Sequence, residues 1–216
     1  MKRRLLFGVL ALAAIAVLSG LGSSYRPESK TGPQVERAQL ALLTSLPLVF
    51  SESFSLEKGG SAALSRLEQN YQVVPIGVAN GASLKGRKLL LMAHPRAQPA
   101  EALVDLDQWV RGGGLLLLLA DPRLEWPSEL PLGDKLRPPP MFADTGLLRH
   151  WGLSLSPDGL STQGGCRLSD GDLIARCSIG RGKVTVIADA DFLNVEDRDG
   201  AGLDLLSREL RGLETR

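Results

Sequence analysis

The chain has 216 residues, of which 44% are hydrophobic and 23% charged, and its formal net charge is +1. This length and composition are typical of one globular domain with an ordinary core. The balanced charge, together with the lack of a basic stripe interleaved with aromatic residues, argues against a nucleic-acid-binding protein.

The first 24 residues carry a predicted targeting signal. Three basic residues at positions 2–4 precede an uncharged run over 5–21, which is at the short end of the ~17–25 residues that span a bilayer. The small residues that follow favour a cleaved signal peptide, whereas the lack of a clean A-x-A site favours a retained anchor. No cysteine follows the run, so a lipoprotein anchor is excluded. Both readings remain open.

The sequence therefore predicts three parts: a signal peptide or membrane helix over 1–24, a linker over 25–38, and an α/β domain over 39–216. The linker is rich in Pro, Gly, Ser and charged residues. Because the positive end of such a segment stays in the cytoplasm, the rest of the chain is expected in the periplasm, either tethered to the inner membrane or released.

The first half of the domain alternates predicted strands and helices. Residues 35–43 are either a short helix or the start of a strand. The expected elements that follow are a strand over 46–50, a helix over 60–70, and strands over 71–76 and 88–93.

The clearest unit lies between Pro99 and Pro122. Leu103, Leu106 and Val110 recur at helical spacing, three glycines at 112–114 end the helix, and residues 115–120 are apolar throughout. A strand that is apolar on both faces is covered by helices on both sides, as in a parallel α/β sheet.

The second half begins with a proline-rich loop over 124–140, which is either a functional lid or a disordered insertion. The expected elements after it are a helix over 144–151, a strand over 152–155, a hairpin of 165–168 and 173–179, a strand over 184–188 and a helix over 203–213. The whole pattern predicts an α/β fold with a mostly parallel, doubly wound, Rossmann-like sheet.

Five segments together resemble the GldG-like and domain of unknown function 4350 families. They are LPLVF from Leu46, YQVVPI from Tyr71, KLLLMAHP from Lys88, LDQWVRGGGLLLLLADP from Leu106 and GRGKVTVIADADFLN from Gly180. The resemblance implies a fold similar to class I glutamine amidotransferases. It also implies an auxiliary role near membrane transport or envelope machinery, with no established chemistry.

The nucleophile of such an amidotransferase is a cysteine at a sharp strand-to-helix turn, paired with a histidine. Here the predicted strand ends carry no cysteine, so no catalytic residue is assigned and a non-enzymatic protein is expected. Cys166 and Cys177 fall in the predicted hairpin, either as a disulfide, which an oxidising compartment favours, or as two buried thiols. No CxxC motif is present, and no zinc ion or cofactor is expected.

Polar residues at predicted strand ends are the candidate ligand-binding residues. Asp121, Asp189 and Asp191 each follow a buried strand, and His94 follows another. Because ligands bind beyond the carboxyl ends of strands in open α/β sheets, these carboxylates could hold a cation, with Asp121 and Asp189 within about 8 Å. The competing interpretation is that each aspartate caps a turn and that His94 is an ordinary loop residue.

Trp126 and Trp151 flank the proline-rich loop and either form a partner-binding patch or pin the loop to the core. The expected function is a non-catalytic interaction module of an envelope or ABC-transporter-related complex, with a protein partner at the carboxyl edge of the sheet. The alternative is a ligand- or metal-binding domain, or a hydrolase-like enzyme, that uses the acidic strand ends.

Overall fold

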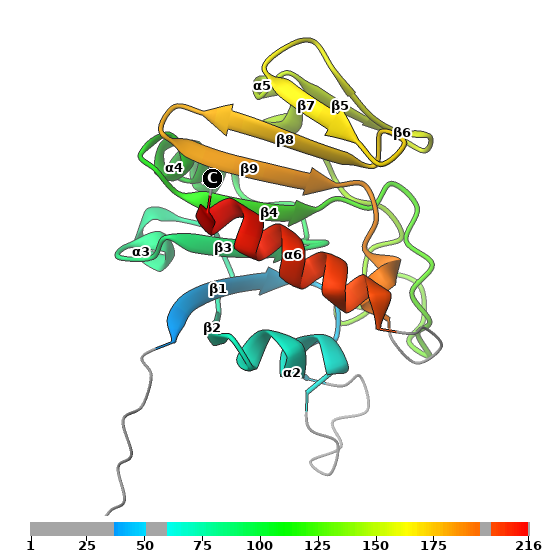
Figure 1. Ribbon diagram of the computed structural model, residues 1–216. Helices are drawn as coiled ribbons and strands as arrows, with labels where there is room; N and C mark the ends of the chain where they lie inside the picture. Colours follow the sequence, from blue (N-terminus) through cyan, green and yellow to red (C-terminus); the bar gives the residue numbers. More distant parts are fainter. Residues whose placement is uncertain (1–36, 51–59, 195–199, 216) are drawn as a thin grey trace, which may run out of the picture. The chain divides into compact units, whose positions relative to one another are not determined.

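The computed structural model describes residues 37–50, 60–194 and 200–215, which belong to one compact unit, Arg37–Arg216. Its centre is a seven-stranded sheet in the order β2-β1-β3-β4-β9-β8-β7, and β5 and β6 form a separate pair (Figure 1). The strands are β1 (Ala38–Thr44), β2 (Tyr71–Pro75), β3 (Leu89–Ala93), β4 (Leu115–Leu119), β5 (Leu153–Ser156), β6 (Gly159–Thr162), β7 (Cys166–Ser169), β8 (Ile174–Ile179) and β9 (Gly182–Ile187).

The sheet is mixed. Strands β2, β1, β3, β4 and β9 pair in parallel, whereas β8 pairs antiparallel with both β9 and β7, and β5 with β6. The predicted fold class, a mostly parallel, amidotransferase-like doubly wound sheet with a membrane helix, is therefore wrong. The physical reason is local: tight turns at 170–173 and 180–181 join β7, β8 and β9, and strands joined by such short turns can only run antiparallel.

Helices cover both faces of the sheet. The described helices are α2 (Ala62–Glu68), α3 (Gly81–Leu84), α4 (Ala100–Arg111), α5 (Leu147–His150), the short 3₁₀ helix η1 (Asp191–Leu193) and α6 (Ala201–Thr215). Helices α2 and α6 pack with one core cluster, and α3 and α4 with the other, so the two pairs lie on opposite sides of the strands in Figure 1.

The central strands β3 and β4 supply side chains to both clusters. Leu89 and Leu91 join the core under α2 and α6, while Leu90 and Met92 join the core under α4. The same alternation runs along β4, whose residues 116–119 are all fully buried. The predicted buried strand is confirmed, and its all-leucine composition follows from having no solvent-facing side.

One predicted strand is wrong. Residues 46–50 form a loop, and the strand lies earlier, at β1. Thr44 Oγ1 accepts a hydrogen bond from the Leu46 N–H at 2.9 Å, which turns the chain out of the sheet, and Pro47 has no N–H to give to a strand ladder.

The predicted membrane attachment is also corrected. Along residues 37–50, 60–194 and 200–215, no helix has the length and apolar character needed to cross a bilayer. The segment 1–24, on which the expected membrane helix, membrane contact and periplasmic location depend, lies outside the described residues. Membrane attachment is not part of the function proposed below.

We predict that Gly182→Ala destabilises the fold. A Cβ at Gly182 would lie 2.0 Å from the Val110 carbonyl oxygen and 2.4 Å from that of Gly114, so strand β9 would have to move away from the end of α4. We expect the free energy of unfolding to fall by at least about 2 kcal/mol, measured by urea denaturation. Gly77→Ala is the control, because a Cβ there meets nothing within 4 Å; equal effects of both variants would contradict this account.

Candidate functional site at the carboxyl edge of the sheet

The carboxyl ends of β2, β1, β3, β4 and β9 share one edge of the sheet because these strands are parallel. The long connection between β4 and α5 runs along this edge (Figure 1). Its two ends are joined, since the Phe142 N–H donates to the Asp121 carbonyl at 2.7 Å and the Leu124 N–H to that of Pro140 at 2.9 Å. The proline-rich loop is thus closed at its base by backbone hydrogen bonds.

His94, the first residue after β3, is fully buried and ties several segments together. Its N–H donates to the Leu119 carbonyl at 2.9 Å, its carbonyl accepts from Ser45 Oγ, and its Nε2 lies 2.9 Å from the Pro139 carbonyl. A carbonyl can only accept, so Nε2 carries the proton. Nδ1 has no hydrogen-bond partner among the described residues. These contacts make His94 a structural link between β3 and the proline-rich loop.

The three predicted aspartates converge. Asp121, Asp189 and Asp191 each bring one carboxylate oxygen within 4.8 Å of the others, which is closer than the separation predicted for Asp121 and Asp189. The reason is that β4 and β9 are neighbours and both end at this edge. Three oxygens so placed resemble part of a site for a hard cation.

Backbone N–H groups, however, already occupy these carboxylates. The Asp121 oxygens accept from the N–H groups of Arg123 and Ala190 at 2.8 and 2.9 Å, and the Asp191 carboxylate accepts from that of Glu125 at 3.0 and 3.1 Å. Asp189 Oδ1 accepts from the Asp191 N–H at 2.8 Å. The cluster therefore joins the start of the long loop to the segment after β9, which is the capping role given above as the competing interpretation.

The tryptophans do not form an exposed patch. Trp151 is 5% exposed and donates from Nε1 to Asp107 Oδ1 at 2.8 Å, while Trp126 is half-buried against the core under α2 and α6. Burial opposes ionisation of Asp107, but the hydrogen bonds from Arg111 and Trp151 outweigh it and lower the pKa of this carboxyl. The partner-binding interpretation is therefore wrong for Trp151, which fastens α5 to α4.

Cys166 and Cys177 are directly opposite each other in the β7–β8 pair and form a disulfide. Both cysteines of the chain are used in this bond, so neither offers a thiolate for nucleophilic chemistry.

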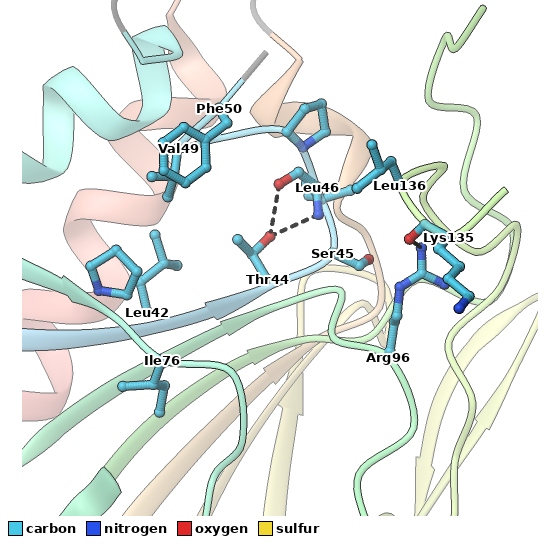
Figure 2. Close-up of a pocket in the computed structure, with 12 residues that line it drawn as sticks. Leu42, Thr44, Ser45, Leu46, Val49, Phe50, Ile76, Arg96, Lys135 and Leu136 are labelled. Atoms are coloured by element: carbon cyan, nitrogen blue, oxygen red, sulfur yellow. Dashed lines mark hydrogen bonds between the residues drawn. The ribbon is translucent and has the colours of Figure 1, made fainter. Parts of the chain in front are cut away.

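An open groove lies at the other end of the same edge, beyond the ends of β2, β1 and β3. It has a volume of about 330 Å³, and Figure 2 shows its walls. We call it the carboxyl-edge groove. Its lining is mostly apolar: Leu42, Thr44, Ser45, Leu46, Pro47, Val49, Phe50, Pro75, Ile76, Arg96, Lys135 and Leu136.

The groove opens to solvent at its rim, where Phe50 is 76% and Leu136 53% exposed. Sequence reasoning missed it because the 46–50 segment read as a strand. The one signal available was Pro47, two residues after the polar pair Thr44 and Ser45, which suits a turn better than a buried strand. No local signal indicates that Lys135 and Leu136 line the same groove as the end of β1, because their position depends on how the proline-rich loop folds.

Comparison with known proteins gives the fold and no family. No protein-family model matches the chain, and no curated protein does. Among solved structures, the mmIFT52 N-terminal domain aligns with a TM-score of 0.53 and 16% identity over 80% of this chain and 97% of that one. At this identity the likeness shows a shared fold alone.

Two further structures align more loosely. The exo-β-1,4-mannosidase Op5Man5 from Opitutaceae bacterium strain TAV5 has a TM-score of 0.49 and 14% identity over 82% of this chain, which spans 36% of the mannosidase. Cytoplasmic Protein STM3548 from Salmonella typhimurium has a TM-score of 0.49 and 10% identity, covering 82% of this chain and 99% of that one.

We predict that His94 stays neutral in mildly acidic solution. Burial lowers the pKa of this imidazole below its ordinary value of 6.5. The folded protein then binds fewer protons than the unfolded chain, so this contribution to stability is complete above pH 6.5 and is lost as the pH falls below it. An NMR titration of the imidazole checks the shift; a midpoint above 6.5 would contradict it.

We predict that Asp191→Asn stabilises the protein at pH 7. Burial raises the pKa of Asp191; the Glu125 N–H lowers it in part, and the nearby carboxylates raise it again. Stability is therefore lost as the pH rises through the raised pKa. Removing the charge should recover less than about 1 kcal/mol, and the gain should vanish below pH ~4, where the unfolded carboxyl is also protonated.

Chemical denaturation at both pH values measures this effect, with Asp158→Asn in the exposed β5–β6 turn as the control. The experiment also separates the two interpretations of the cluster. If Mg²⁺ or Ca²⁺ raises the melting temperature of the wild-type protein but not that of Asp191→Asn, the aspartates hold a cation and the purely structural interpretation is wrong.

Proposed function

We propose that this protein is a non-catalytic interaction module whose carboxyl-edge groove binds an extended, apolar segment of a partner protein. The observation that carries the proposal is the exposure of large apolar side chains around the groove, above all Phe50 and Leu136. Exposed apolar side chains that surround a hollow are typical of protein-binding sites.

Two features favour a protein segment over a small molecule. A small-molecule site buries most of its ligand, whereas half or more of Phe50 and Leu136 would remain in water unless a larger partner covered the rim. The β4–α5 connection adds further exposed apolar side chains, Leu132 at 82% and Met141 at 60%, and these would extend the contact beyond the groove.

The other polar candidates at this edge support a binding role over catalysis. Asp121 and Asp191 accept hydrogen bonds from backbone N–H groups of the loop and of the segment after β9, and the Nε2 of His94 is bound to the Pro139 carbonyl.

We expect peptides selected from a random display library to bind the wild-type protein at the groove, and Leu136→Glu to weaken that binding at least tenfold. The substituted carboxylate would be desolvated against the apolar peptide. Isothermal titration of the selected peptides measures the affinities.

Leu173→Glu is the matched control, because Leu173 is 42% exposed but lies between β7 and β8, away from the groove lining. It should bind with wild-type affinity. The proposal fails if no peptide binds, or if both variants bind as the wild type does.

A further inference from the structure

The polar side chains of the carboxyl-edge groove differ in whether they have a hydrogen-bond donor left for a ligand. Thr44 Oγ1 donates to the Ala93 carbonyl at 2.9 Å, and Ser45 Oγ donates to the carbonyl of His94. Each hydroxyl has a single proton, so neither hydroxyl can donate a further hydrogen bond to a ligand. The side-chain donors left for a ligand are those of Arg96 and Lys135, which Figure 2 shows on the same side of the groove.

Neither cation is neutralised within the described part of the chain. Arg96 donates through one terminal nitrogen to the backbone carbonyls of Lys135 and Arg137, at 2.7 and 2.5 Å, and carbonyls carry no net charge. No ion pair among the described residues involves Arg96 or Lys135. The groove lining contains no carboxylate.

Asp134, the acidic residue that precedes Lys135, is not a counter-charge for the two cations. Asp134 Oδ1 accepts a hydrogen bond from the Leu136 N–H at 2.7 Å, which stabilises the turn, and Asp134 does not line the groove. The groove is thus apolar where Val49 and Phe50 lie and cationic where Arg96 and Lys135 lie.

We infer that the partner segment carries a carboxylate next to its apolar side chains, and that Arg96 and Lys135 receive this carboxylate while the apolar wall takes the side chains. This inference rests on the proposed function and specifies the partner's chemistry. Arginine and lysine donate and never accept, so the complementary group is an acceptor, and an anionic acceptor makes the stronger, charge-assisted hydrogen bond.

The arrangement is also organised before binding. The two carbonyl contacts hold the Arg96 guanidinium in place, so less side-chain freedom is lost when a carboxylate binds. A basic or neutral segment would supply no counter-charge to these two cations, which have no ion-pair partner among the described residues, and this disfavours such partners.

The test is a charge exchange. A selected peptide is made in three forms, with its acidic residue kept, changed to the amide, or changed to lysine. Fluorescence anisotropy measures the binding of each form to the wild-type protein, to Lys135→Glu and to Lys88→Glu. Lys88 is the control because it is exposed and precedes β3 at the opposite edge of the sheet.

We expect the amide form to bind the wild-type protein about fivefold to tenfold more weakly than the acidic form. Lys135→Glu should weaken the acidic form and strengthen the lysine form, whereas Lys88→Glu should change neither. Binding of the acidic form should also decrease as salt is added.

The inference is overturned if the selected peptides contain no acidic residue, if the amide binds as well as the acid, or if the two lysine variants behave alike. In those cases Leu136→Glu still reports whether the groove binds peptides, so the proposed function is judged separately. If no peptide binds the wild-type protein, the proposed function and the inference fail together.

Discussion

The burial of strands β3 and β4 on both faces is the constraint on which the structure depends. Their leucine side chains alternate between two core clusters, and each cluster needs a layer of helices, because apolar surface left in water costs roughly 25 cal/mol per Å². Two-sided burial keeps these strands in the middle of the sheet, parallel and in register. The residues just past their ends, His94 and Asp121, are therefore brought to one edge.

At the carboxyl edge of the sheet, some side chains stabilise the fold, and others remain exposed and able to contact a partner. Asp121, Asp191 and the Nε2 of His94 make hydrogen bonds to the backbone of the long loop. The shifted pKa values of Asp191 and His94 therefore belong to groups with a structural role. At the groove, by contrast, apolar side chains stay exposed, and within 37–50, 60–194 and 200–215 no ion pair involves Arg96 or Lys135. In the proposed function, the exposed apolar side chains and the two cations indicate the partner's binding site, and the shifted pKa values of His94 and Asp191 do not.

Local sequence patterns were informative where one element decides its own structure. The helical spacing before Gly112 and the apolar run of β4 predicted α4 and β4 closely. The hairpin placed Cys166 and Cys177 on paired strands, and the register that sets them opposite each other comes from the structure. The aspartates were found because a strand end is a local feature. Their role stayed open between cation binding and capping, because it depends on N–H groups from the distant segments around Glu125 and Ala190.

The sequence by itself determined that apolar runs bounded by glycine and aspartate form buried strands, since burial, turn chemistry and strand length act over a few residues. Tertiary structure alone decided which strands are neighbours in the sheet, the burial of Trp151 and the groove that Phe50 shares with Lys135 and Leu136. Each of these depends on contacts between residues far apart in the chain, and such contacts leave no periodic or compositional trace.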